Sequence, residues 1–185
     1  MDDSTFVQPA AVLAAAGVGE GMRVADIATS SGFFTRAAAR MVGPAGVVWA
    51  VDIHQPMLAR VHNLAIAEGL HNVHVVHGNV EQLGGSKLPS STFDVVIVAN
   101  VLFTLEHPAG LVAEAWRVLR PGGVALVVDW AGSFGGLGPH PGHVVARADM
   151  LQLFLADGFG DVVDIPAGAY HWGFVVRKQD AVSAQ

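Results

Sequence analysis

Short apolar runs and helical segments alternate along this chain, and this alternation constrains the fold more than any other feature. The apolar, β-branched runs predict strands at residues 22–27, 47–53, 73–77, 93–99 and 124–129. Segments with helical spacing of apolar residues lie between or beside them, at residues 9–16, 33–41, 55–68 and 108–119. Strands that alternate with helices form a parallel sheet with right-handed crossovers, so we expect an α/β fold.

The C-terminal part departs from this alternation. A helix is expected at residues 146–156, followed by strands at 162–165 and 173–177. The gap between these two strands is too short for a helical crossover, so they form an antiparallel hairpin. The sequence therefore predicts a Rossmann-like, doubly wound and mostly parallel seven-stranded sheet that ends in an antiparallel C-terminal hairpin strand.

Length and composition are typical of one globular domain. The 185 residues are 52% hydrophobic and 14% charged, which excludes a disordered chain. We expect a single domain over 1–185, with an N-terminal helical segment at 1–20, a core at 21–178 and a tail at 179–185. The absence of cysteine excludes disulfides and thiolate zinc sites.

Charge and hydropathy limit the partners. A net charge of −6 disfavours nucleic acid, whose binding depends on basic side chains that neutralise phosphates. No apolar run reaches the roughly 18 residues of a membrane span, and the acidic start MDDSTF lacks the apolar region of a secretory signal. We therefore expect a cytoplasmic protein without a membrane partner. The mean hydropathy of +0.46 favours a homodimer that covers apolar surface.

The turn after the first strand is the candidate ligand site. Ligands of open α/β sheets bind beyond the carboxyl ends of the strands, where the strand order reverses and the first strand-to-helix turn lies. That turn spans residues 28–32, and Asp52 follows Gly32 by 20 positions near the end of the second strand. This separation is expected of a carboxylate that accepts hydrogen bonds from a ribose.

Four segments carry a resemblance to a known family. They are VADIATSSG at 24–32, VWAVDI at 48–53, FDVVIVANVLFTLEHP at 93–108 and EAWRVLRPGG at 114–123. Together they resemble the class I S-adenosylmethionine-dependent methyltransferase family over residues 21–178. The resemblance implies S-adenosylmethionine as cofactor and in-line transfer of its methyl group to an unidentified acceptor. It also implies that the terminal hairpin is the reversed edge strand of that family.

The resemblance assigns roles to single residues. Asp26 would orient the methionine end of the cofactor, and Asn100 would lie near it. Ile53 would flank the adenine, whose edge Asn79 and Val80 would contact. The cofactor-binding residues implied or argued above are Asp26, Ala28, Ser30, Gly32, Asp52, Ile53, Asn79, Val80 and Asn100.

The first turn departs from the family pattern, which usually has glycines where Ala28 and Ser30 stand. A left-handed conformation at either residue would cost about 1–2 kcal/mol, which is roughly tenfold in affinity if it falls on the bound state. The hydroxyls of the turn could instead supply hydrogen bonds that glycines lack. This departure keeps open a catalytically silent, partner-binding domain. A nicotinamide-dependent oxidoreductase ranks third, because the turn lacks the G-x-G-x-x-G pattern.

Methyl transfer requires orientation rather than a catalytic triad, because holding the nucleophile and the methyl group in line supplies much of the acceleration. If the acceptor must lose a proton, the candidate bases are His140, His143 and His171, all in loops. Two loop histidines without a neighbouring carboxylate make an incomplete metal site, so no metal is expected. Asp129 and Trp130, which end the fifth strand, are expected to shape the acceptor pocket.

Overall fold

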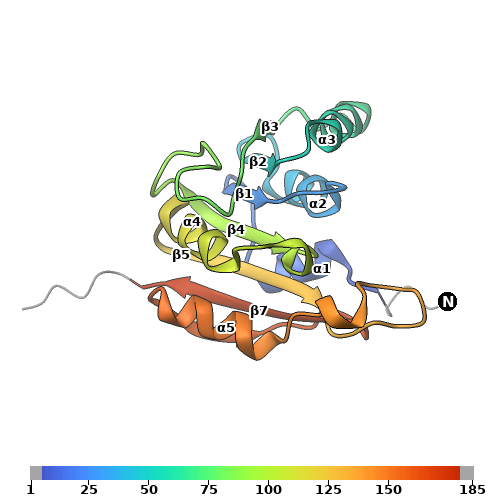
Figure 1. Cartoon of the computed structure of the whole chain (residues 1–185). Helices are drawn as coiled ribbons and strands as arrows, with labels where there is room; N and C mark the ends of the chain where they lie inside the picture. The colour runs from blue at the N-terminus through green and yellow to red at the C-terminus, as the bar shows by residue number, and fades with distance from the viewer. Residues whose placement is uncertain (1–5, 180–185) are drawn as a thin grey trace, which may run out of the picture.

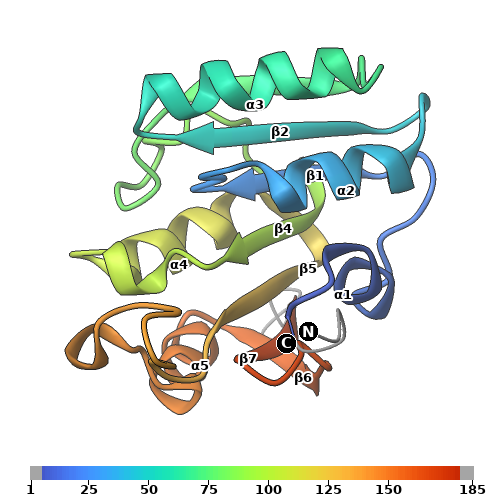
Figure 2. The same ribbon diagram turned by 90° about the vertical axis from the view of Figure 1, so that its right-hand side faces the viewer.

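The computed structural model describes residues 6–179, which form one sheet with helices on both faces (Figures 1 and 2). The strands are β1 (Arg23–Ile27), β2 (Val47–Asp52), β3 (Val73–His77), β4 (Phe93–Ala99), β5 (Leu119–Trp130), β6 (Phe159–Asp164) and β7 (His171–Lys178). The helices are α1 (Pro9–Ala15), α2 (Phe33–Val42), α3 (Gln55–Ala67), α4 (Pro108–Val118) and α5 (Arg147–Ala156), with short 3-10 helices η2 (Leu102–Thr104) and η3 (Pro141–His143).

The strand order is β3-β2-β1-β4-β5-β7-β6. The first five strands are parallel, while β7 runs antiparallel to both β5 and β6. The predicted mostly parallel seven-stranded sheet with a C-terminal antiparallel hairpin is therefore confirmed. Because β1 lies between β2 and β4, the strand order reverses there, which places the switch point of the sheet between β1 and β4.

Burial on both faces of the sheet explains the continuous apolar runs in the sequence. In β4, Val96 and Val98 pack into a core with α4 and α5, whereas Val95 and Ile97 pack into a second core with α1, α2 and α3. Successive strand side chains point to opposite faces, so a strand covered on both faces needs apolar residues at every position. None of the helices among residues 6–179 is long and apolar enough to cross a membrane.

The fifth strand begins earlier than expected, at Leu119 rather than at residue 124. The sequence Pro121-Gly122-Gly123 looks like a break, but here it lies inside β5 as an irregularity. The pairing of β4 with β5 shifts register between Phe93 and Val95, where the β5 partners move from Leu119 to Val124. Such a bulge accommodates both a proline without an N–H donor and Gly122, whose φ is 70°. Helix α4 accordingly ends at Val118.

The β3–β4 connection contains no helix; instead, one buried carboxylate fixes it. Glu114 of α4 is fully buried and accepts hydrogen bonds from the backbone N–H groups of Gly84 (2.7 Å) and Ser86 (3.1 Å) and from the Ser86 hydroxyl. The Arg117 guanidinium donates to it from one turn further along the helix, at 2.7 and 2.8 Å. Glu114 therefore holds the connection against α4.

Candidate functional site

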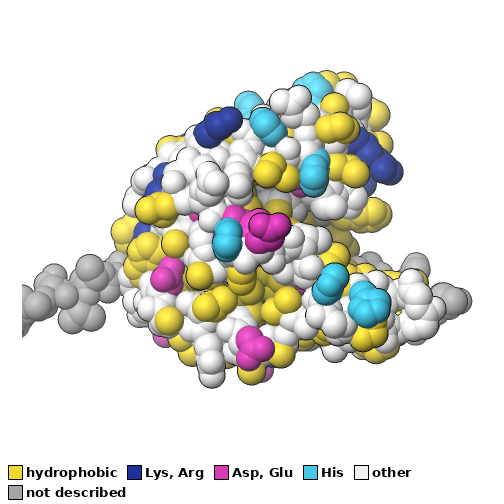
Figure 3. All heavy atoms as spheres, viewed as in Figure 1, with side chains coloured by type: hydrophobic (Ala, Val, Ile, Leu, Met, Phe, Trp, Pro, Cys, Tyr) yellow, Lys and Arg dark blue, Asp and Glu magenta, His cyan; other side chains and the backbone are white. Residues whose placement is uncertain are grey.

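Two adjoining pockets lie beyond the carboxyl ends of the strands, on the side where Figure 3 shows the molecule notched. The first, here called the Asp52 pocket, has a volume of about 270 Å³ and contains Asp52, Ile53, Asn79 and Val80. The second, here called the aromatic pocket, has a volume of about 320 Å³. Its walls are Phe6, Val7, Pro9, Asp26, Thr29, Ser30, Ser31, Phe33, Phe34, Ala99, Asn100, Trp130 and His171.

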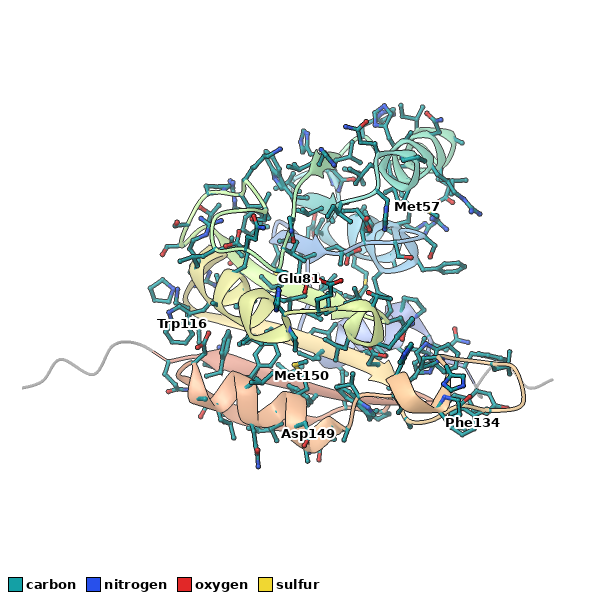
Figure 4. The ribbon with its side chains drawn as sticks, in the orientation of Figure 1. Met57, Glu81, Trp116, Phe134, Asp149 and Met150 are labelled. Atoms are coloured by element: carbon teal, nitrogen blue, oxygen red, sulfur yellow. The ribbon has the colours of Figure 1, made fainter. Side chains whose placement is uncertain are left out.

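Ser30 and Asn100 line both pockets, so the two adjoin at the switch point and are together called the cleft. Ala28 also lines the Asp52 pocket. Met57 of α3 and Glu81 of the β3–β4 connection belong to opposite walls of that pocket (Figure 4). The topology therefore brings together residues that are far apart in the chain.

The first turn has a strained backbone. Ala28 has a φ of 61° and Ser30 a φ of 50°, so both occupy the left-handed region, as does Gly32 at 72°. At Gly32 a side chain is disfavoured both by the positive φ and by sterics, because a Cβ there would lie 2.7 Å from Cγ2 of Val61. Asn100 has a φ of 55°, so three of the six non-glycine residues with positive φ among residues 6–179 line this cleft. Backbone strain of this kind clusters at ligand sites.

Replacing Ala28 or Ser30 by glycine should stabilise the fold. Removing the strain of a left-handed alanine or serine should stabilise the fold by about 1–2 kcal/mol. The extra backbone entropy of glycine in the unfolded chain offsets about 0.5–1 kcal/mol of this gain. We therefore expect the free energy of unfolding in urea to rise by roughly 0.5–1 kcal/mol for each change. The control Ala37→Gly in α2 should instead lose about 1 kcal/mol. A loss at Ala28 or Ser30 equal to that at Ala37 would show that the turn is not strained.

Asp52 fastens the first turn to the end of β2. Its Oδ2 accepts the backbone N–H of Ser30 at 2.9 Å, and its Oδ1 accepts that of His54 at 2.8 Å. The side chain is buried, and its two oxygens still have lone pairs for hydroxyl donors. Within the same pocket, Asn79 Oδ1 accepts the N–H of Glu81 at 2.9 Å, which orients the Asn79 amide and leaves its NH₂ group as a donor.

Asp26, near the end of β1, has a buried carboxyl group beside the first turn. It is 2% exposed and accepts hydrogen bonds from the hydroxyls of Thr29, at 2.9 Å, and Thr35. Burial raises the pKa of Asp26 from 3.8 to about 6; the charge of Asp52 adds to this rise, and the two threonine hydroxyls oppose it. The aromatic pocket thus contains an acidic group that is anionic at neutral pH and poorly hydrated.

The raised pKa of Asp26 predicts a pH dependence of stability. Because the folded protein binds this proton more tightly than the unfolded chain, the folded state gains stability as the pH falls from 7 towards 4. A rise in pKa from 3.8 to about 6 corresponds to about 3 kcal/mol. Urea unfolding therefore compares the free energy of unfolding of Asp26→Asn with that of the wild type at pH 4 and at pH 7. As the pH rises from 4 to 7, the variant should gain up to that amount relative to the wild type. A difference independent of pH would contradict the assignment.

Two polar side chains in the aromatic pocket have no protein partner. The Oδ1 atom of Asn100 and both ring nitrogens of His171 are buried without a hydrogen bond. The His171 ring centroid lies 4.3 Å from that of Trp130, and the two residues are paired across β5 and β7. Burial lowers the pKa of His171, so the imidazole is neutral at pH 7. Unpaired buried polar groups in a cleft are available to a ligand.

The structure separates the three candidate bases. His171 lines the aromatic pocket, but His140 and His143 are exposed around η3, with ring centroids 5.9 Å apart, and line neither pocket. Asp129 also lies outside the pocket linings: it accepts the backbone N–H groups of Val101, Leu102 and Trp130 and thereby fixes the segment after β4. Among residues 6–179, no three metal-ligating side chains come together.

Sequence reasoning missed the contribution of the N-terminal segment. Phe6 and Val7, which precede the first helix, and Pro9, which begins it, line the aromatic pocket. The ring centroid of Phe6 lies 5.2 Å from that of Tyr170, which in turn lies 4.8 Å from that of Phe134. Phe134 belongs to the loop after β5 (Figure 4). An isolated aromatic residue before the first helix gives no periodic signal, so its place could not be inferred from spacing.

Comparison with known proteins identifies the family. A family model described as a methyltransferase domain matches residues 25–127, from β1 into β5 and across both walls of the Asp52 pocket. The chain therefore belongs to the methyltransferase domain family, which confirms the resemblance seen in its sequence. The family and the fold imply S-adenosylmethionine as the cofactor.

Individual relatives agree with this family. The chain is 35% identical over 119 residues to a ubiquinone/menaquinone biosynthesis C-methyltransferase of Burkholderia vietnamiensis, covering 64% of this chain and 47% of the relative. It is 32% identical over 112 residues to a demethylmenaquinone methyltransferase of Geobacillus stearothermophilus, covering 60% and 47%. The chain thus spans about half the length of the curated relatives it matches.

Solved structures extend the likeness to nearly the whole chain. A SAM-dependent methyltransferase from Aquifex aeolicus superposes with a TM-score of 0.84 at 28% identity, covering 96% of this chain and 94% of that one. The [4+2]-cyclase SpnF superposes with a TM-score of 0.75 at 19% identity, covering 92% and 79%. The second likeness shows the fold alone, and the reaction must be argued from the site.

Proposed function

We propose that this protein is an S-adenosylmethionine-dependent methyltransferase whose cofactor lies along the cleft formed by the two pockets. The observation that carries the proposal is the grouping of Asp52, Ile53, Asn79 and Val80 in one pocket that adjoins, at Ser30 and Asn100, the pocket that contains Asp26. Adenosine would occupy the Asp52 pocket, and the methionine part would reach into the aromatic pocket.

The residues present fit such a ligand. Asp52 has free lone pairs for ribose hydroxyls, and the Ile53 side chain, 52% exposed, offers an apolar face to the adenine. Asp26 supplies negative charge for an ammonium group, and the unpaired Asn100 Oδ1 supplies an acceptor near it. When bound, the cofactor supplies a methyl group activated by a sulfonium.

The chain's own part in the reaction is binding and orientation. The N–H groups of Thr29, Ser30 and Gly32 are bonded within the protein, to Val51 O, Asp52 and Thr29 O. The hydroxyls of Ser30 and Ser31, which line the aromatic pocket, are further donors that the turn offers to a ligand. A fixed cleft holds the reactants in line, which is the main source of acceleration for a displacement of this kind.

Calorimetric titration with S-adenosylmethionine, S-adenosylhomocysteine and NAD⁺ tests the proposal. We expect micromolar binding of both adenosyl ligands and none of NAD⁺. Binding of no ligand would favour the catalytically silent, partner-binding domain instead. The single-domain boundaries, the homodimer, the cytoplasmic location and the lack of a nucleic-acid partner stay predictions from the sequence.

A further inference from the structure

Resting on the proposed methyltransferase function, we propose that the acceptor is an uncharged, planar molecule with an aromatic hydroxyl group, and that His171 accepts the proton of that hydroxyl. The acceptor would lie in the aromatic pocket beside Trp130. The structure supports this acceptor class by the shape, the charge and the unused hydrogen-bonding groups of the pocket.

Flat side chains from four parts of the fold surround the pocket. Phe6 comes from the N-terminal segment, Phe33 and Phe34 from the start of α2, Trp130 from the end of β5 and His171 from the start of β7. Aromatic walls favour planar ligands, because rings gain both burial and ring–ring contacts there. A volume of about 320 Å³, partly needed by the cofactor, limits the acceptor to a compact molecule.

The charges around the pocket disfavour an acidic acceptor. Asp26 is the charged residue in the lining, and none of the described lining residues is Lys or Arg. Arg36 stacks on Phe33, at 5.2 Å, but its guanidinium donates to the carbonyls of Ser31 and Gly32 and pairs with Glu68. An acceptor with a carboxylate or phosphate would therefore meet no cationic side chain among the described residues of this lining and would lie near the carboxylate of Asp26, which is costly in a buried site.

His171 supplies an unused donor and an unused acceptor. The residue is 7% exposed, and neither ring nitrogen has a hydrogen-bond partner. A neutral imidazole carries one N–H and one lone pair, and leaving both unpaired in a buried site costs free energy. A hydroxyl beside the ring would satisfy the lone pair. The other titratable groups near His171 are Asp26 in the same pocket and Tyr170, its neighbour in sequence.

The proposed step balances as follows. The proton of the acceptor hydroxyl passes to the lone pair of a His171 ring nitrogen, and the oxygen uses its electron pair to bond the methyl carbon. The carbon–sulfur bond breaks with its electron pair moving to sulfur, which leaves S-adenosylhomocysteine and a methoxyarene. The imidazolium then loses its proton to solvent. No further co-reactant is required.

Binding of small probes tests the acceptor class on the full chain, with and without saturating S-adenosylhomocysteine. The probes are phenol and 2-naphthol, their methyl ethers, and benzoate as the anion. We expect 2-naphthol to bind at least about tenfold more tightly than its methyl ether, the usual value of one buried hydrogen bond. His171→Phe, which keeps the ring packed on Trp130, should reduce 2-naphthol to the affinity of the ether. His143→Phe, the same change outside the pockets, should have no effect.

Turnover gives the second readout. Formation of 2-methoxynaphthalene, followed by mass spectrometry, should fall by about 10²-fold or more in His171→Phe, as expected for loss of a proton acceptor. The wild-type rate should decline at acidic pH as His171 becomes protonated, and protonation of Asp26, whose pKa is about 6, adds to the decline. His171→Gln, which cannot take up the proton, should lose the part of the decline that Asp26→Asn retains, and Asp26→Asn isolates the part that belongs to His171.

The outcomes separate this inference from the proposed function. Equal binding of 2-naphthol, its ether and benzoate, or an unchanged affinity and rate in His171→Phe, would overturn the acceptor class even if S-adenosylhomocysteine binds. Conversely, a protein that binds 2-naphthol through His171 but no adenosyl ligand would refute the methyltransferase function and leave the pocket assignment standing.

Discussion

Replacing Glu114 by glutamine is expected to lower the free energy of unfolding by about 2–4 kcal/mol, because it removes the buried charge that accepts several hydrogen bonds, and hydrogen bonds to charged groups are worth about 1.5–3 kcal/mol. The carboxylate is fully buried and satisfies Gly84, Ser86 and Arg117 together. Burial by itself would raise the pKa of Glu114, but the hydrogen bonds from Arg117, Ser86 and Gly84 outweigh it and lower the pKa. The folded protein therefore needs the charged form, which glutamine cannot supply.

Urea unfolding at pH 7 measures this effect. The matched control is Asp164→Asn, which removes the same charge from the exposed pair with Arg147 and should cost less than about 1 kcal/mol. Since the folded pKa of Glu114 is lowered, its contribution is present above the ordinary value of 4.5 and is lost as the pH falls through the folded pKa. Equal losses for both variants would contradict the role given to Glu114.

Replacing Asp52 by asparagine is expected to weaken binding of S-adenosylhomocysteine by about 10–100-fold. Hydrogen bonds to a charged acceptor are worth about 1.5–3 kcal/mol, and asparagine keeps one acceptor oxygen without the charge. The change also disturbs the first turn, because both carboxylate oxygens already accept backbone N–H groups, from Ser30 and His54.

Isothermal titration compares this variant with Asp149→Asn, the same chemical change on α5, where Figure 4 places Asp149 away from the cleft. Asp149→Asn should bind S-adenosylhomocysteine like the wild type. Thermal unfolding of both variants serves as a check that the fold is retained. Undiminished affinity in a folded Asp52→Asn would exclude Asp52 as the ribose acceptor.

The fold was largely predictable, because its strands are buried on both faces and so appear as uninterrupted apolar runs. Strands β3 and β4 begin and end where the sequence predicts. The error at β5 has a tertiary cause: Pro121 and Gly122 break strands locally, but pairing with β4 through a bulge retains them in the sheet. The spacing of residues could not reveal this bulge. It also could not reveal that Ala28 and Ser30 adopt the left-handed backbone conformation.

The site was predictable where it follows strand ends and unpredictable where distant segments meet. Asp52 ends β2 and Asn79 follows the neighbouring strand β3, so their placement in one pocket follows from the topology. The aromatic pocket instead joins Phe6 to Trp130 and His171, and no local pattern encodes such contacts. For the same reason the sequence could not distinguish His171 from His140. His171 lines the cleft and His140 does not.

A crystal structure of the protein with S-adenosylhomocysteine tests the central claim most directly, because it locates the ligand atom by atom. The account predicts the ribose hydroxyls on Asp52, the adenine between Ile53 and Val80, and the amino acid end beside Asp26 and Asn100 in the aromatic pocket. Clear density for the ligand outside this cleft, or an empty cleft at saturating ligand, would contradict it.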